Sequence, residues 1–337
     1  MQRILRTRSA RIGATVAAMV LLVAIILYLG QAKGFGPIQY VQLVLDGIRG
    51  GSIYALIALG FVVVFNVTGI INFAQGGFVM SGAMLAVAFN NLALPLPPAL
   101  QLALAVVFGV VVTTVIGALM ERLTIFPARH SHTLTLIIIT VGVYIFMQGM
   151  ALLIWGANAY TLPAFSSLAL EDKILRSGGI MLKAQSLWIW ATLGVVLVAL
   201  YFFFERTLLG KALRACSINR RAAELMGINP SRMSLLSFAM AAALGAIGGI
   251  VLSPATRPIY DMGLKLGLKG FIAAIMGGMV SSPGAVLGGI LLGVLENVAA
   301  GVTKAGFKDI FAFIVLILIL LFRPQGIIGG GERGVEQ

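Results

Sequence analysis

Charged residues are scarce in this sequence, and cysteine and histidine are nearly absent. Charged side chains make up 10% of the 337 residues, whereas a soluble domain carries about 25%. The single cysteine excludes an internal disulfide and a thiolate metal site. The two histidines form no HExxH pattern, so we predict no metal site. These shortages argue against a soluble fold and against a metalloenzyme.

Long apolar runs recur along most of the chain. Hydrophobic residues account for 60% of it, and many runs approach the roughly 20 residues that a helix needs to cross a bilayer. We predict membrane helices over residues 12–30, 51–67, 70–89, 99–120, 134–155, 188–204, 235–252, 271–281, 285–300 and 310–322. The predicted fold class is all-α, a polytopic transmembrane helical bundle of about 8–10 spans, as one membrane domain over residues 1–337.

The net charge of +13 comes mostly from basic residues in short segments between the apolar runs. Such residues contact membrane lipid and partner subunits, so we expect no nucleic acid. Basic residues near the ends of spans favour the cytoplasmic side. We therefore place residues 121–133, a loop at 205–232 and a tail at 323–337 in the cytoplasm, and residues 157–185 outside.

The chain begins with an extension, residues 1–35, that has two interpretations. Arg3, Arg6, Arg8 and Arg11 precede the apolar run at 12–30. That run is longer than the usual signal-peptide core of about 7–15 residues, which favours an extra transmembrane helix. A signal-like segment is the alternative.

Two glycine-rich regions, residues 69–82 and 267–289, resemble each other. Broken helices persist in a membrane only where protein or a wet cavity satisfies their backbone. Their occurrence in both halves predicts an internal repeat with short or broken helices beside a central path, although glycine also permits ordinary close packing. Four polar residues near the first region are candidates for lining the solute path or for capping broken helix ends: Asn66, Asn72, Gln75 and Ser81.

Glu296 interrupts an apolar run and is the one carboxylate that the predicted boundaries place inside a span. An ionisable residue within a membrane marks a candidate functional position. Lys304 and Lys308 lie toward the same end of the helix. A structural ion pair, or a side chain that reaches the interface, is therefore the alternative interpretation.

The loop at 205–232 is the candidate docking element. No GxxxxGK[ST] motif is present, so ATP-driven transport would need a motor on another chain. Good helix formers precede Gly227 and Asn229-Pro230, which predicts a short helix between two spans. A basic loop held by anionic lipid is the alternative. The candidate coupling residues are Arg214, Arg220, Arg221, Ala222, Ala223, Glu224, Leu225, Met226 and Gly227.

Several motifs resemble, in order, those of the branched-chain amino-acid permease family of ABC importers. The segment around Ala222-Ala223 and Gly227 resembles the coupling motif of these permeases. Arg221 stands where many relatives carry glutamate, and Gln75 stands where histidine is common. The other matching stretches are GSIYALIALG at 51–60, INFAQG at 71–76, GG at 277–278, SPGA at 282–285, KD at 308–309 and FRPQG at 322–326.

The resemblance implies a transport subunit that is not an enzyme and binds no cofactor itself. It also implies a bacterial inner-membrane location and amino acids, branched-chain or hydrophobic, as solutes. The implied partners are a second homologous permease, two ABC ATPase subunits that hold Mg-ATP, and an extracytoplasmic solute-binding protein. A urea or short-amide importer is one alternative. An ion-coupled secondary transporter is another, although that class commonly places more charge at mid-membrane than Glu296 alone.

Overall fold

The computed structural model describes residues 28, 30–31, 33–92, 94–165, 176–177, 180–303, 306, 308–322 and 325–328, the side chains of 176, 177 and 322 excepted. Most of the extension at 1–35 and most of the tail at 323–337 lie outside the described residues. The two interpretations of the run at 12–30 therefore both stay predictions.

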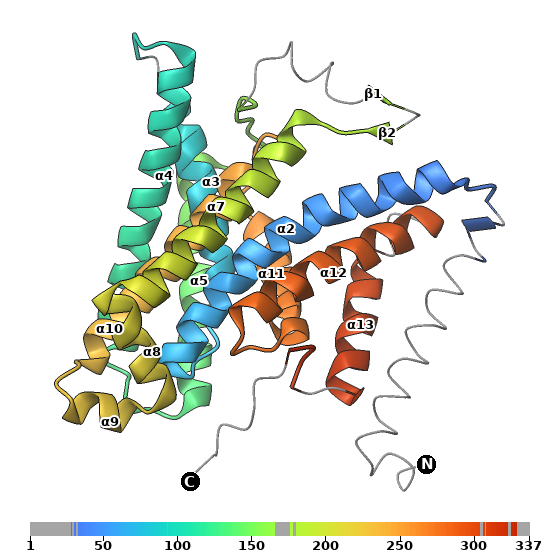
Figure 1. Ribbon diagram of the computed structural model, residues 1–337. Coiled ribbons are helices and arrows are strands. Elements are labelled where there is room, and N and C mark those ends of the chain that lie inside the picture. Colours follow the sequence, from blue (N-terminus) through green and yellow to red (C-terminus); the bar gives the residue numbers. More distant parts are fainter. Residues whose placement is uncertain are drawn as a thin grey trace, which may run out of the picture.

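Helices dominate the described part of the chain (Figure 1). The two-residue strands β1 and β2 pair antiparallel at the opposite end of the bundle from α9. The predicted all-α class is confirmed. The elements are α2 (Pro37–Thr68), α3 (Gln75–Asn90), α4 (Pro98–Met120), the π-helix η2 (Glu121–Ile125), α5 (Thr133–Trp155), β1 (Arg176–Ser177), β2 (Ile180–Met181), α7 (Ala184–Arg206), α8 (Leu208–Ile218), α9 (Arg220–Leu225), α10 (Pro230–Leu252), α11 (Met262–Gly277), α12 (Ser282–Val302) and α13 (Lys308–Phe322).

Six of the described helices are long and apolar enough to cross a membrane: α2, α4 with η2, α5, α7, α10 and α12. Three further apolar helices are shorter, with 16 residues in α3, 16 in α11 and 15 in α13. The mixture of long and short apolar helices agrees with the predicted polytopic bundle.

Proline and glycine set several helix ends. Pro37, Pro98 and Pro230 each lie in the first turn of a helix, where the N–H that proline lacks would have no intrahelical partner. Gly69 follows α2 with φ +73°, a left-handed conformation that favours glycine. The long helix α2 therefore stops there, and the chain crosses to α3 through the irregular segment 69–74.

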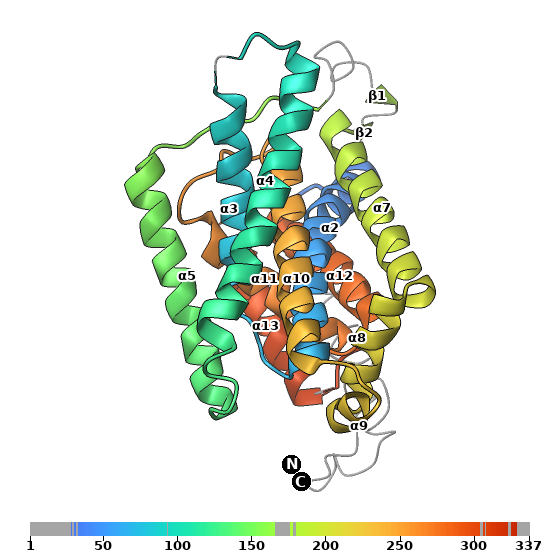
Figure 2. The same ribbon diagram turned by 90° about the vertical axis from the view of Figure 1, so that its left-hand side faces the viewer.

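Helices α2–α5 and α10–α13 follow one plan in opposite directions (Figures 1 and 2). Each set starts with a long helix, breaks, and continues with a 16-residue helix and two further helices. The packing is reciprocal, because α3 packs on α10 as α11 packs on α2, and α4 packs on α10 as α12 packs on α2. The predicted internal repeat is therefore present, and it is inverted.

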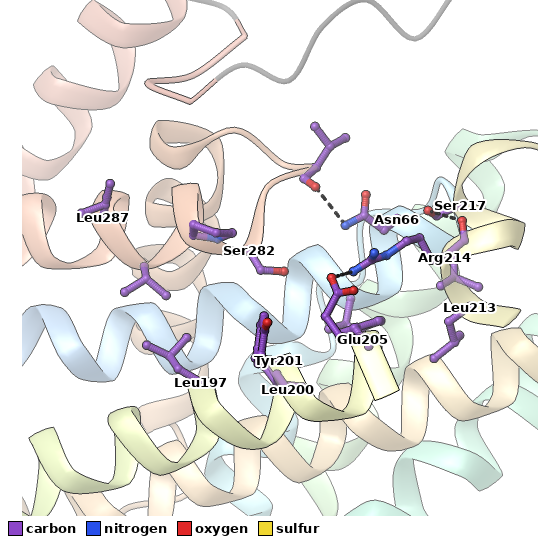
Figure 3. Close-up of a pocket in the computed structure, with 16 residues that line it drawn as sticks. Asn66, Leu197, Leu200, Tyr201, Glu205, Leu213, Arg214, Ser217, Ser282 and Leu287 are labelled. Carbon is purple, nitrogen blue, oxygen red and sulfur yellow. Dashed lines mark hydrogen bonds and ion pairs between the residues drawn. The ribbon is translucent and has the colours of Figure 1, made fainter. Parts of the chain in front are cut away.

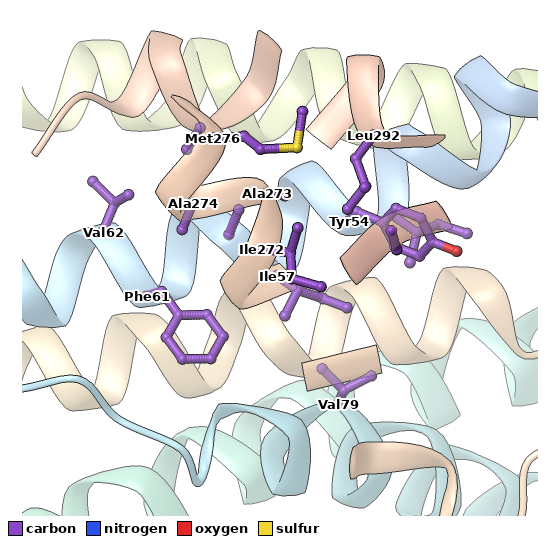
Figure 4. Close-up of a cluster of buried hydrophobic side chains, with 14 of the residues drawn as sticks. Tyr54, Ile57, Phe61, Val62, Val79, Ile272, Ala273, Ala274, Met276 and Leu292 are labelled. Carbon is purple, nitrogen blue, oxygen red and sulfur yellow. The ribbon is translucent and has the colours of Figure 1, made fainter. Parts of the chain in front are cut away.

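Helices α2 and α10 form the centre of the bundle. The most apolar stretch of α2 is 83% buried, whereas those of α4, α5 and α7 are 17–22% buried. Figure 4 shows Ile57 and Phe61 of α2 among side chains of the later helices, including Ile272 and Leu292. The outer helices expose apolar faces, which require a bilayer as their solvent.

The predicted helix at 51–67 begins earlier than expected. Helix α2 starts at Pro37 and so includes Asp46 and Arg49, whose side chains form an ion pair of 3.4 Å. The predicted helix starts after these charges because they interrupt the apolar run. A charge pair three residues apart on one helix face is compatible with the helix.

The second predicted break was also misplaced. Helix α11 runs from Met262 to Gly277, whereas the prediction was 271–281. The chain breaks at 253–261 and 278–281 rather than throughout 267–289. Gly267 and Gly270 lie inside the helix because they pack against α3 and α2.

Candidate functional site

The predicted coupling segment forms two short helices, α8 and α9, at one end of the bundle (Figures 1 and 2). Thr207 Oγ1 accepts the Gly210 N–H at 3.0 Å and caps α8. Asn219 Oδ1 accepts the Ala222 N–H at 3.0 Å and caps α9. Gly227, with φ +85°, follows the end of α9. The predicted short helix is present, and α8 is an element that the sequence analysis missed.

The side chains of α9 and its end divide into an outer and an inner set. Leu225 is 88% exposed and Met226 is 82% exposed. Ala223 is buried and faces the bundle, so it holds the helix in place. Large exposed apolar side chains beside charges are typical of an interaction surface. The outer set, which we call the α9 outer face, consists of Arg220, Arg221, Ala222, Glu224, Leu225, Met226 and Gly227.

Arg214 lies apart from the α9 outer face. Its Nη2 donates to Glu205 Oε1 at 2.6 Å, and both residues line a cavity of about 730 Å³ between α2, α7, α8 and the start of α12 (Figure 3). Leu197 and Leu200 belong to the apolar wall of this cavity. The predicted coupling residue Arg214 thus joins α8 to the end of α7.

A small buried cluster anchors α8 and α9 to the bundle. Leu213 and Cys216 of α8 and Ala223 of α9 pack with Val67 of α2 and Met233 of α10. Burial raises the pKa of the Cys216 thiol, so the single cysteine is a packing residue and not a reactive one. A displacement of α9 would therefore act on α2 and α10, the first helices of the two repeats.

Helices α3 and α11 cross near their N-terminal ends. A Cβ on Gly76 would lie 2.2 Å from the Gly263 carbonyl oxygen, and one on Gly263 would lie 2.5 Å from the Gly76 carbonyl oxygen. Small residues permit this close backbone approach. Because both helices begin after a break, the crossing brings together two helix N-termini with their free N–H groups.

Asn72 and Gln75 lie at the start of α3 beside this crossing, and both are fully buried. Asn72 Oδ1 accepts the Ala74 N–H at 3.1 Å in the turn before α3, whose N-cap residue, Ala74, has no side-chain cap. Gln75 Nε2 donates to the Ala241 carbonyl of α10 at 2.9 Å. Among the described residues, neither Asn72 Nδ2 nor Gln75 Oε1 has a hydrogen-bond partner. Each side chain thus retains one unused polar atom.

The other two predicted path residues lie elsewhere. Ser81 is buried farther along α3. Asn66 lines the cavity of about 730 Å³, and its Nδ2 donates to the Val280 carbonyl at 3.2 Å. Asn66 therefore joins the end of α2 to the turn after α11. The structure does not bring the four residues into one site.

The sequence analysis missed Tyr144 and Asp261, which also lie near the crossing. The ring of Tyr144 on α5 packs against Gly77 and Gly263. Asp261 directly precedes α11, and its Oδ1 is buried without a hydrogen-bond partner among the described residues. Pro254 and Pro258, which precede Asp261 at short spacing, are the sequence signal that could have placed a break here.

Glu296 of α12 is the buried member of an ion cluster. Its Oε1 accepts a hydrogen bond from Lys269 Nζ of α11, and Lys308 Nζ lies 3.9 Å away. Lys269 Nζ also pairs with Asp309 Oδ1 at 2.9 Å. The structure shows the ion pair that was the alternative interpretation, but the main partner is Lys269. Lys304 lies outside the described residues.

Glu296 is not the only carboxylate inside a span. Glu121 lies within the span Pro98–Ile125 and is 2% exposed. The prediction missed it because the apolar run was ended at residue 120. Within the described ranges, no group of three or more His, Cys, Asp and Glu side chains is placed to hold a metal ion.

Comparisons with known proteins cover most of the chain. A family model described as "Branched-chain amino acid transport system / permease component" matches residues 43–320. The high-affinity branched-chain amino acid transport system permease protein BraD of Pseudomonas aeruginosa is 36% identical over 299 residues, which cover 87% of this chain and 97% of BraD. LivH of Escherichia coli K12 is 32% identical over 301 residues, which cover 88% of this chain and 97% of LivH. A probable LivH of Methanocaldococcus jannaschii is 25% identical over 300 residues, which cover 86% of this chain and 92% of that protein.

Proposed function

Because the chain belongs to the permease family of branched-chain amino acid transport systems, we propose that it is the membrane subunit of an ATP-driven importer of branched-chain amino acids. The proposal is carried by the match of the family model over residues 43–320, together with alignments that cover 97% of the length of BraD and of LivH. The chain is a multi-pass protein of the inner membrane, with six described helices able to span it.

The complete importer would need other chains for its chemistry. We place Mg-ATP on two ATPase subunits, and this chain would bind no cofactor and hydrolyse no ATP. A second homologous permease would complete the membrane part. A solute-binding protein would act at the end of the bundle opposite α9, and it would make most of the choice among solutes.

The α9 outer face would dock on one ATPase subunit. Leu225 and Met226 would supply apolar contact, and the charges around them would set the angle of the helix. Only interactions that differ between two conformations shift their populations. Closure of the ATPase subunits on ATP would therefore have to move α9, and the buried cluster beneath α8 and α9 would pass this movement to α2 and α10.

The solute path would pass the crossing of α3 and α11. Helix N-termini favour an anionic group such as the carboxylate of an amino acid. Asn72 Nδ2, Gln75 Oε1 and Asp261 Oδ1 supply further polar atoms beside these N-termini. The path would thus combine neutral amides with one carboxylate that could accept a hydrogen bond from an ammonium group.

Leu225→Ser tests the docking of α9. The variant removes the most exposed apolar side chain of the α9 outer face without touching the buried cluster. Loss of a central apolar contact should weaken binding of the ATPase subunits about tenfold. We expect ATP-dependent leucine uptake into proteoliposomes that contain the complete transporter to fall with it. Co-purification measures the binding, and radiolabelled leucine measures the uptake.

Leu153→Ser is the matched control. Leu153 is 82% exposed and lies near the end of α5 that points away from α9. Its substitution should leave ATPase binding unchanged. Equal losses of ATPase binding in the two variants, or no loss of ATPase binding in Leu225→Ser, would contradict docking through α9. Leucine accumulation by this chain alone, without ATPase subunits, would contradict the importer itself.

A further inference from the structure

A basic cavity lies between the end of α4 and the start of α10, at the same end of the bundle as α9. Its volume is about 300 Å³. Figure 2 shows the lower ends of α4, α5 and α10 near one another at this end. The lining residues are Glu121, Arg122, Phe126, Arg129, Asn229, Ser231, Arg232 and Leu235. None of them is used by the proposed transport mechanism.

The π-helix η2 arranges the first two arginines. The Phe126 N–H donates to the Glu121 carbonyl at 2.8 Å, a bond five residues apart that widens the end of α4. The guanidinium carbons of Arg122 and Arg129 lie 4.3 Å and 4.4 Å from the centre of the Phe126 ring. One aromatic ring thus holds two cations in place by cation–π contact.

The third arginine comes from α10. Asn229 Oδ1 accepts the backbone N–H groups of Ser231 and Arg232 at 3.0 Å and 3.3 Å, which fixes the start of the helix. Arg129 Nη1 donates to Ser231 Oγ at 3.3 Å and joins the two walls. The cavity is therefore assembled from residues about 100 positions apart in the sequence, and its walls are held by specific contacts.

Among the described residues, no ion pair within 4.0 Å engages the three guanidiniums. The ion pairs within the described ranges engage Arg49, Arg214, Lys269 and Lys308, and none engages Arg122, Arg129 or Arg232. The one carboxylate in the lining, Glu121, is buried. Three positive and one negative side chain leave the lining with a net charge of +2. This site favours an anion.

An exposed apolar stripe runs along α4 and η2 toward the residues of this cavity. Val111, Val115, Leu119 and Leu123 recur at four-residue spacing and so share one helix face. All four are more than half exposed. The stripe ends beside Arg122, so a ligand with hydrocarbon chains and an anionic head would match both features.

We propose that this cavity binds the phosphate headgroup of an anionic glycerophospholipid from the leaflet on the α9 side, with its acyl chains along the α4 stripe. Basic pockets between helices on the cytoplasmic side of a membrane are suited to anionic headgroups. An acidic segment of a soluble partner would use the arginines but not the stripe. The apolar stripe therefore decides in favour of lipid.

A lipid titration of the full-length chain in detergent tests the proposal. Native mass spectrometry would follow binding of dioleoyl phosphatidylglycerol and of dioleoyl phosphatidylcholine, which has the same chains and no net charge. We expect phosphatidylglycerol to bind about tenfold more tightly. Arg122→Gln, Arg129→Gln and Arg232→Gln should each weaken it about fivefold. Arg206→Gln removes the same charge at the end of α7, outside the cavity, and should leave binding unchanged.

Three outcomes would overturn the proposal. Equal affinity for the two lipids would show that the cavity does not select an anion. Equal weakening by Arg206→Gln would show a general surface-charge effect. Full competition by soluble glycerol phosphate, or full displacement of lipid by added ATPase subunits, would assign the cavity to another ligand. None of these measurements depends on transport, so they leave the proposed function untouched.

Discussion

The two halves of the bundle share one helix plan but bury different chemistry. Near the break of the first half, the buried polar side chains are the neutral amides Asn72 and Gln75. The second half buries Glu296 with Lys269, which also contacts Asp309. The common plan therefore depends on the reciprocal packing of the helices, and the ion cluster is an addition to one half.

The difference has an energetic consequence. Loss of one hydrogen bond by a neutral side chain inside a membrane protein costs about 0.6 kcal/mol. A buried charge that loses its partner costs more, about 3–5 kcal/mol, because it has been taken out of water. The second half should thus tolerate substitution of its buried polar residues less well than the first half.

Lys269→Met should produce the largest loss. Glu296, whose side chain is 0% exposed, would keep Lys308 Nζ, at 3.9 Å, as its one ion-pair partner among the described residues. We expect the free energy of unfolding in detergent to fall by about 3–5 kcal/mol. Denaturant titration of the purified chain provides the measurement.

Two further variants give this prediction its controls. Asp309→Asn removes the exposed partner, whose side chain is 60% exposed, and should cost about 1 kcal/mol or less. The double variant Lys269→Met with Glu296→Met removes both charges and should recover most of the lost stability. A Lys269→Met chain as stable as the wild type would show that the halves do not differ energetically.

Gly76→Ala should have the next largest effect, and Gly263→Ala should match it. Each new Cβ would approach the opposing carbonyl oxygen, at 2.2 Å and 2.5 Å respectively. Overpacking of this kind costs about 1–3 kcal/mol, measured by the same denaturant titration.

Gly142→Ala on α5 is the control, because no heavy atom lies within 4 Å of its added Cβ. It should be neutral or slightly stabilising. A loss of stability in Gly76→Ala without a similar loss in Gly263→Ala would show that the two halves are not equivalent at their crossing.

The sequence was most informative where local chemistry decides the structure. Apolar runs identified the outer helices, and Gly227 with Asn229-Pro230 predicted the end of α9. It was least informative where distant residues meet. The predicted helix at 271–281 leaves out Lys269. Its ion pair with Glu296 joins residues 27 positions apart, so no local pattern reveals it. The same limit applies to Asp261, which only the folded chain places beside α3.

Gln75→Leu should have the smallest effect on stability, and it tests whether the neutral amides near the break of the first half serve transport. Gln185→Leu is its matched control, because both amides are buried and donate to α10, to the Ala241 and Val251 carbonyls at 2.9 Å and 2.8 Å. Each variant should lose about 0.6 kcal/mol, a typical value for one hydrogen bond inside a membrane protein. Only Gln75 lies beside the crossing of α3 and α11, so only Gln75→Leu should lower leucine uptake by the complete transporter. Equal uptake in the two variants would leave Gln75 as a packing residue and move the solute path away from the start of α3.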